Sequence, residues 1–187
     1  MPELTGANIP FAVRARVCLL RDLGSACPPD NAFAIIQGLE TVALRMKQHC
    51  TNAEQVVNFL KNHKEVTKVI FSTEHEKPIA DRAKKYLNGG NGPMVGIELK
   101  GGIEAGKKFI ESLKMFYHVA NIGDARSLAI HPASTTHSQL NEKELAASGV
   151  TQSYVRLCIG LEHIDDIIED LDQALKKSSK GTLKAVS

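Results

Sequence analysis

The sequence lacks any long apolar run. Its apolar stretches, such as "FAIIQGLE" and "YVRLCIGLE", fall far short of the roughly 20 residues that a helix needs to cross a bilayer. The N-terminus also lacks the charged and then apolar pattern of a secretory signal peptide. We therefore expect no membrane segment, and we expect the chain to be cytoplasmic.

Charge of one sign is not in excess. The 23 Lys and Arg residues against 21 Asp and Glu residues give a formal net charge of +2, and the basic residues are scattered along the chain. A nucleic-acid-binding domain normally carries its basic residues in a patch or stripe. We therefore expect no nucleic acid among the partners.

Cysteine is sparse, and no two cysteines form a C-x-x-C pair. The four cysteines are Cys18, Cys27, Cys50 and Cys158, and they lie far apart. Zinc sites and redox couples usually show closely spaced cysteines, and disulfides are rare in the cytosol. We predict four reduced thiols and no metal site built on them.

What the sequence does contain is the composition of an ordinary globular domain. Hydrophobic residues make up 43% of the 187 residues and charged residues 24%, values close to the averages for soluble proteins. At about 150 residues per domain, this length predicts one substantial domain and leaves room for an appendage.

The pattern changes near residue 65. Before it, "FAVRARVCLLRDLG" and "NAFAIIQGLETVALRMKQH" read as long helices, separated by a break at residues 24–29. After it, the strand patterns "VTKVIF", "MVGIEL" and "YVRLCI" alternate with helices, and Leu128 with Ile130 suggests a further strand. This order predicts a helical arm over residues 1–64 and, over residues 65–187, a two-layer α/β sandwich with helices covering one face of a sheet.

One charged residue interrupts an apolar strand pattern. Alternation in "YVRLCIG" places Val155 and Leu157 on one face of the strand and Arg156 on the other. A guanidinium that is always charged needs an anionic partner there. A helix carboxylate, or solvent at a sheet edge, would make Arg156 structural. A carboxylate ligand would make it functional, because two parallel N–H donors match two carboxylate oxygens.

The polar segment "NIGDARSLAIHPASTTHSQL" (121–140) invites three readings. His131, His137 and Asp124 could bind a metal, but the gap between the histidines matches no standard ligand spacing. Ser134, His137 and Asp124 could form a triad, but no nucleophile-elbow pattern surrounds the serine. We expect these side chains to hydrogen-bond the backbone of an ordered loop. The glycine-rich "NGGNGP" (88–93) lacks the Lys-Ser/Thr end of a phosphate-binding loop and predicts a turn.

Several stretches together resemble one family. "ANIGDARSLAIHPASTTHSQL" followed by "ASGVTQSYVRLCIGLEHIDDIIEDLDQAL" is similar to the C-terminal domain of the O-acetylhomoserine sulfhydrylases, in the Cys/Met-metabolism group of pyridoxal-phosphate (PLP) enzymes. "RARVCLLRDLG", "NAFAIIQGLETVALRMKQHCTNAEQVVNFLKNH" and "AKKYLNGGNGPMVGIELKGG" resemble the same family in the same order. The similarity runs from about Phe11 to Leu175.

The resemblance implies a fold and a set of site residues. It implies the C-terminal domain of a fold-type I PLP-dependent transferase, with a small, mainly antiparallel sheet covered by helices. It implies that Arg156 anchors the α-carboxylate of O-acetylhomoserine, and that Asn121, Ile122 and Gly123 line the same pocket. The whole enzyme would convert its substrate to homocysteine in methionine biosynthesis, as a homo-oligomer, typically a tetramer.

The family's cofactor lysine has no counterpart here. In the family, a lysine after a Ser-x-Thr-like motif holds the cofactor as a Schiff base, in a larger N-terminal domain. The Thr-Lys pair of this chain, Thr67 and Lys68, falls in a predicted strand instead. Because an amine is essential to bind the aldehyde covalently, we expect this chain alone to bind no PLP and to be inactive. Its N-terminal helices, which would pack on that domain, are expected to expose apolar faces and either to self-associate or to be disordered.

Three smaller departures concern local geometry. "FSTEHEKP" (71–78) stands where relatives have a Tyr-Pro-Gly-Leu-like turn, Cys158 where a serine is common, and Pro29 where an aromatic residue is usual. Two other functions stay open at this point. The chain could be a non-catalytic module, for carboxylate binding or dimerisation, left after loss of the catalytic half, or a structural α/β domain in which Arg156 forms a salt bridge.

Overall fold

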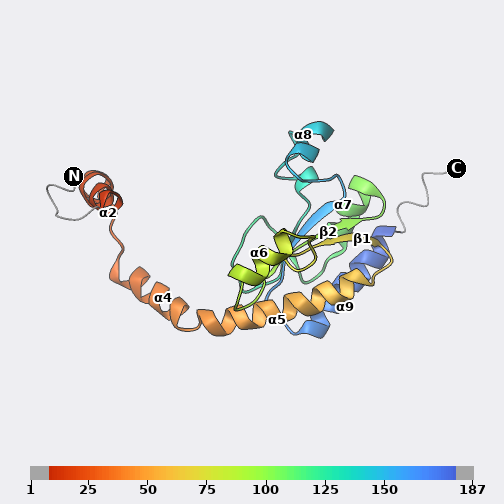
Figure 1. Cartoon of the computed structure of the whole chain (residues 1–187), viewed down its shortest axis with the longest axis horizontal. Helices are drawn as coiled ribbons and strands as arrows, with labels where there is room; N and C mark the ends of the chain where they lie inside the picture. Colours follow the sequence, from red (N-terminus) through yellow and green to blue (C-terminus); the bar gives the residue numbers. More distant parts are fainter. Residues whose placement is uncertain (1–8, 180–187) are drawn as a thin grey trace. The chain divides into compact units, whose positions relative to one another are not determined.

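The computed structural model describes residues 9–179, which form two compact units, one up to Ala43 and one from Leu44 (Figure 1). In the first unit, α2 (Pro10–Arg14), the π-helical η1 (Ala15–Leu20) and α3 (Arg21–Leu23) follow one another directly. Gly24, with φ +68°, ends this run in the left-handed conformation that glycine adopts at low cost. After the predicted break, α4 (Pro29–Glu40) begins with proline at its first position.

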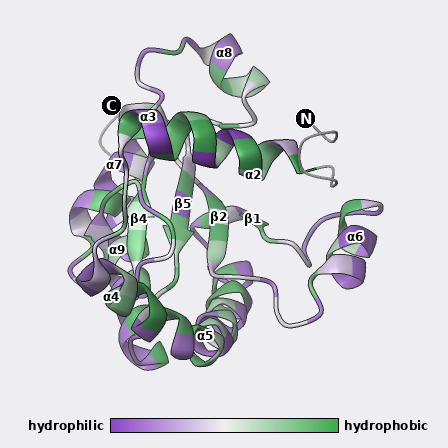
Figure 2. Ribbon diagram, turned by 90° about the vertical axis from the view of Figure 1, so that its left-hand side faces the viewer, coloured by the Kyte–Doolittle hydropathy of each residue, from purple (hydrophilic) through white to green (hydrophobic). Residues whose placement is uncertain are grey.

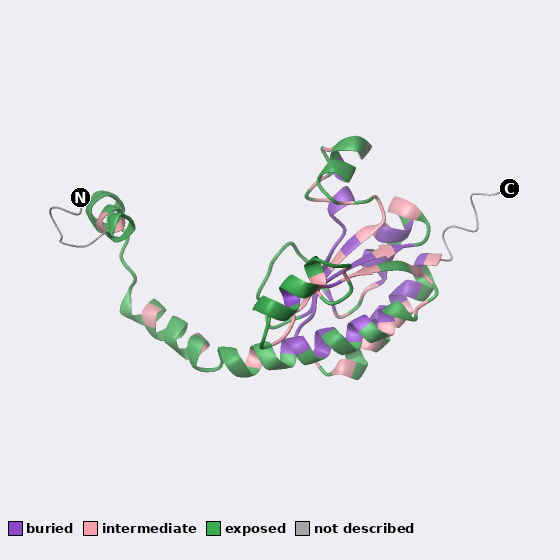
Figure 3. Cartoon of the chain, viewed as in Figure 1, coloured by how far each residue is buried: buried purple, intermediate pink, exposed green. Residues whose placement is uncertain are grey.

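Apolar side chains of the first unit stay exposed. Over residues 9–43 no residue is buried within the described chain, as Figure 3 shows for α2 and α4. Phe11 is 86% exposed, Leu23 73% and Phe33 65%. Uncovered apolar faces of this kind are what the sequence predicts, whereas the self-association expected from them stays a prediction.

The second unit contains the sheet and the helices that cover it. The strands expected from the sequence occur in the expected order, and β3 (Tyr117–His118), η2 (Pro132–Ser134) and α8 (Glu142–Ala147) are additional elements. The elements are α5 (Val42–Lys61), β1 (Val66–Ile70), α6 (Ile79–Tyr86), β2 (Met94–Leu99), α7 (Gly102–Ser112), β3 (Tyr117–His118), β4 (Leu128–Ile130), η2 (Pro132–Ser134), α8 (Glu142–Ala147), β5 (Tyr154–Cys158) and α9 (Ile164–Ser179).

The sheet has the order β1-β2-β5-β4-β3. The pairs β1/β2, β2/β5 and β4/β5 are antiparallel, and only β3/β4 is parallel. This confirms the expected small and mainly antiparallel sheet. It also places β5, the strand that carries Arg156, between two neighbours instead of at an edge.

Helices α5, α7 and α9 form the layer that covers the sheet. Their apolar stripes share one buried cluster with the strands, and Figure 2 shows α7 and α9 beside the strands. Side chains in this cluster with no exposed surface include Val56, Phe109, Leu171 and Leu157. Within the described residues, no helix is both long and apolar enough to cross a membrane.

The position of α5 bears on the predicted division of the chain. The sequence-based boundary falls between residues 64 and 65, whereas the second compact unit begins at Leu44. The stripe of Ala53, Val56 and Leu60 on α5 lies in the core of that unit. The role assigned to residues 1–64, packing on a separate cofactor domain, stays a prediction.

Two elements escape the sequence patterns. The strand β3 is only two residues long, so it shows no alternation. Helix α8 begins at a capping box, in which the Asn141 side chain accepts the backbone N–H of Glu144 and the Glu144 carboxylate accepts that of Asn141. A short capping motif of this kind is difficult to recognise in the sequence of a polar loop.

Candidate functional site

Arg156 lies at the centre of the sheet, where β5 pairs with both neighbours. Its backbone is opposite Gly96 of β2 and Ile130 of β4. Val155 and Leu157 are fully buried in the helix-covered core. Because successive strand residues point to opposite faces, Arg156 projects from the face that the core helices leave uncovered, as the alternation predicts.

The guanidinium of Arg156 has a weak internal partner. Its Nη2 donates a hydrogen bond of 3.3 Å to the Asn121 carbonyl oxygen. Among residues 9–179, no carboxylate lies within ion-pair distance of it. The salt bridge that would make Arg156 structural is thus absent from the described part of the chain. A half-buried, always-charged fork without an anion can accept a carboxylate.

The predicted turn at residues 121–123 lies beside this arginine. The Ile122 N–H donates to Asn121 Oδ1 at 2.9 Å, which forms an Asx-type turn. Gly123 has a φ of +88°, in the left-handed region that favours glycine. Arg156 and Asn121 are therefore brought into contact, while the Ile122 side chain is 64% exposed. Their roles toward a substrate stay predictions.

Neutral side chains flank Arg156 on the same face of β5. Burial raises the pKa of the Cys158 thiol, although the Gly123 N–H and the charge of Arg156 oppose the shift. Burial likewise raises the pKa of the Tyr154 phenol. Both groups stay protonated near neutral pH, so they leave the positive charge of Arg156 uncompensated.

A cleft of about 400 Å³ opens next to Arg156. It lies at the sheet face formed by β1, β2 and β5, and the loop after β1 and the loop before β2 also line it. Its lining holds hydrogen-bond donors and apolar side chains, but no lysine, aspartate or glutamate. The lining residues are Ile70, Phe71, Ser72, His75, Ile79, Asn91, Met94, Val95, Gly96, Tyr154 and Arg156.

Most residues of this cleft carry no signal in the sequence. Ser72 and His75 come from "FSTEHEKP", a segment noted only as a departure from the family, and Asn91 comes from "NGGNGP", interpreted only as a turn. The residues of the 121–123 turn do not line the cleft but border it through the Asn121 carbonyl. Arg156 is the predicted site residue that the cleft contains.

His131 is a core histidine and not a ligand. Its ring is fully buried, with Nε2 2.8 Å from the Gln152 carbonyl oxygen and Nδ1 2.8 Å from Ser134 Oγ. The carbonyl can only accept, so Nε2 carries the proton and Nδ1 accepts from the serine. Burial lowers the pKa of this imidazole. The loop thus satisfies its own polar groups, as expected.

The metal site and the triad are not assembled. Within the described residues, no three His, Cys, Asp or Glu side chains are grouped as metal ligands. The Asp124 carboxylate accepts the backbone N–H of Arg126 at 3.0 Å and its Nε at 3.3 Å, which lowers the pKa of Asp124. His137 contacts Thr136 Oγ1 at 2.9 Å instead of joining Ser134 and Asp124.

Comparison with known proteins gives consistent matches. The family model "Cys/Met metabolism PLP-dependent enzyme" matches residues 7–176. The chain is 51% identical over 172 residues to an O-acetyl-L-homoserine sulfhydrylase of Leptospira meyeri, a match covering 91% of this chain and 39% of the relative. It is 40% identical over 171 residues to an L-methionine gamma-lyase of Fusobacterium nucleatum subsp. polymorphum, covering 91% of this chain and 43% of that relative.

A solved structure shares the fold as well as the sequence. It is described as an O-acetylhomoserine (thiol)-lyase from Campylobacter jejuni that contains a pyridoxyl-lysine monophosphate. The match has a TM-score of 0.82 at 41% identity and covers 92% of this chain and 41% of that one. The chain therefore spans about two fifths of the length of the proteins it matches.

Proposed function

Because this chain belongs to the Cys/Met metabolism family of PLP-dependent enzymes, we propose that it forms the substrate-side part of an O-acetylhomoserine sulfhydrylase. The proposed reaction replaces the acetoxy group of O-acetylhomoserine with sulfide, and it yields homocysteine and acetate. The cofactor, when bound, supplies the electron sink for this chemistry. The similarity to a named sulfhydrylase supports this activity over the γ-lyase activity of a more distant relative.

The observation that carries the proposal is the geometry of Arg156. Its guanidinium stands at a cleft, on a central strand, with no carboxylate of the described chain to neutralise it. A substrate α-carboxylate placed there accepts two charge-assisted hydrogen bonds, and contacts of this type contribute about 1.5 to 3 kcal/mol each. In the proposed role, Arg156 binds and orients the amino acid but does not touch the bond that breaks.

The cleft does not provide for covalent attachment of the cofactor. No lysine lines it, and an aldehyde cofactor needs an amine to form a Schiff base. We assign that lysine to the part of the full-length relatives that this chain does not match. The residues present therefore fit the carboxylate side of a PLP enzyme, and we derive no step of the reaction from this chain beyond substrate binding.

Binding to the isolated chain tests the proposal. O-Acetylhomoserine is titrated into the ¹⁵N-labelled wild-type chain and into each variant, and the backbone amide signals are followed by NMR. We expect Arg156→Ala to weaken binding at least about tenfold, the lower end of the estimate above. Arg156→Lys should restore it only in part, because a point charge cannot reproduce the fork.

A matched control separates this site from general charge effects. Arg82→Ala removes an exposed guanidinium from α6, outside the cleft lining, and should leave the affinity unchanged. Equal affinities for the wild-type chain and Arg156→Ala would show that Arg156 does not hold the carboxylate. If the chain binds O-acetylhomoserine, and no protein that contains this chain together with a cofactor domain consumes sulfide, the remaining function is that of a non-catalytic carboxylate-binding module.

A further inference from the structure

The cleft beside Arg156 holds a second group suited to bind a ligand. Asn91 lines the cleft, and its Oδ1 accepts a hydrogen bond of 2.9 Å from Ser72 Oγ. An amide has an acceptor end and a donor end, and in this structure the acceptor end, Oδ1, faces the serine hydroxyl. The Asn91 Nδ2 group, which carries two N–H donors, has no acceptor among the described residues.

The loop that carries Asn91 is held on both sides. At Gly90, with φ +134°, an added Cβ would lie 2.6 Å from Cys50 Sγ, so the backbone packs directly against the buried cysteine of α5. On the other side, the Pro93 carbonyl accepts the N–H of Ile159 at 2.9 Å. Anchors on both flanks keep the Asn91 amide in place, as a specificity contact requires.

The cleft that Arg156 and Asn91 line also has an apolar part. Ile70, Ile79 and Met94 contribute apolar side chains to the same lining. The lining contains no carboxylate, so Arg156 and Asn91 both present N–H donors that an acceptor on a ligand can meet. A ligand with a carboxylate at one end, methylenes in the middle and a neutral carbonyl at the other end satisfies all three regions.

We propose that Asn91 is a specificity-determining residue, whose Nδ2 donates to the acyl carbonyl oxygen of an O-acyl amino acid held by Arg156. This inference rests on the proposed function, because it takes the carboxylate on Arg156 as given. It selects a 2-amino-4-acyloxy acid over the same acid without the carbonyl. No bond is made or broken at Asn91, so it contributes binding and orientation only.

The test compares two ligands that differ in one group. O-Ethylhomoserine carries a methylene in place of the carbonyl of O-acetylhomoserine, with the same number of heavy chain atoms. Both are titrated by NMR into the wild-type chain and into Asn91→Ala, with Asn58→Ala on the exposed face of α5 as the matched control. We expect the wild-type chain and the control to bind the ester about fivefold more tightly than the ether. Asn91→Ala should bind the two equally, with its affinity for the ether unchanged.

The outcomes separate this inference from the proposed function. If the wild-type chain binds ester and ether equally, or if Asn91→Ala keeps the preference, the assignment of Asn91 is wrong. If Asn91→Ala loses affinity for both ligands in the same proportion, Asn91 is a structural residue and the inference is also wrong. Arg156→Ala, by contrast, should lose both ligands. Retention of both by that variant would overturn the carboxylate site itself.

Discussion

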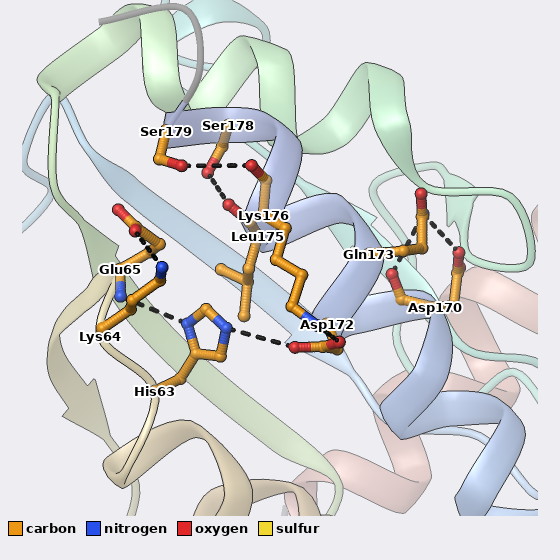
Figure 4. Close-up of polar contacts among 10 residues, drawn as sticks. All are labelled: His63, Lys64, Glu65, Asp170, Asp172, Gln173, Leu175, Lys176, Ser178 and Ser179. Carbon is orange, nitrogen blue, oxygen red and sulfur yellow. Dashed lines mark hydrogen bonds and ion pairs between the residues drawn. The ribbon is translucent and has the colours of Figure 1, made fainter. Parts of the chain in front are cut away.

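Replacing Asp170 with alanine should cost a large part of the stability of the second unit. This carboxylate on α9 is only 6% exposed. It accepts the backbone N–H groups of Lys114 at 2.9 Å, Met115 at 2.8 Å and Phe116 at 3.3 Å. Figure 4 shows a further contact, in which Gln173 Nε2 donates to Asp170 at 2.9 Å. One carboxylate thus accepts the backbone N–H groups of three successive residues in the loop that follows α7.

The size of the effect follows from the donors left behind. A hydrogen bond to a charged group contributes about 1.5 to 3 kcal/mol, and a buried donor without an acceptor costs a similar amount. Lys114 is exposed, so water can satisfy its N–H, whereas Phe116 is buried and its N–H cannot be satisfied in this way. We count the full cost of the buried Phe116 N–H and part of the cost of the half-buried Met115 N–H. On this basis we expect Asp170→Ala to lower the free energy of unfolding by about 3 kcal/mol.

Urea unfolding followed by circular dichroism measures this loss. With a slope of about 2 kcal/mol per molar urea, the midpoint should fall by about 1.5 M at an unchanged slope. Asp166→Ala is the matched control, because this carboxylate is exposed in the first turn of the same helix and contributes about 0.5 kcal/mol or less. If the two variants lose the same small amount, the loop does not depend on the buried carboxylate and the reasoning is wrong.

Two other expectations concern protonation and the cofactor. Burial holds the pKa of His131 below its ordinary value of 6.5, so the unfolded chain takes up a proton first as the pH falls. Stability should therefore decline below about pH 6.5 in the wild-type chain and decline less in His131→Asn, as urea midpoints between pH 8 and 5 would show; parallel profiles would contradict this. Mixing the chain with pyridoxal phosphate, reducing with borohydride and mapping peptides should yield no adduct on one unique lysine, because no lysine lines the cleft. A single stoichiometric adduct would show a cofactor-binding amine that the cleft does not reveal.

Regular patterns account for the parts of the fold that the sequence predicts. The alternation in "MVGIEL" matches β2 residue for residue, and Ile167, Leu171 and Leu175, which are spaced at the helical period in the sequence, lie on the buried face of α9. Both elements have one face buried, so the period of the apolar residues reports the element directly. β3 and α8 are too short for any period, and the polar loop around them gives no other signal.

The residues of the candidate site also fall into those that the sequence predicts and those that it does not. Arg156 is predictable because a charge within an apolar strand is visible in the sequence, and alternation places it on one face. Ser72 and Asn91 are not, because they lie 19 residues apart in two polar turns that the sheet brings together. His131 shows the opposite case, since a polar loop can suggest a catalytic histidine where the fold buries a structural one.

Gly96 ties the fold of this sheet to the chemistry of its open face. It is opposite Arg156 on β2, and a Cβ added there would meet Cε2 of Tyr154 at 2.6 Å. The absent side chain therefore makes room for the phenol ring, which lies over the glycine and lines the cleft next to Arg156. A glycine inside a strand weakens the strand and often marks such a close approach. Because burial also keeps the phenol neutral, the ring does not neutralise the guanidinium, and a carboxylate that enters the cleft meets a charge that no carboxylate of the described chain pairs with.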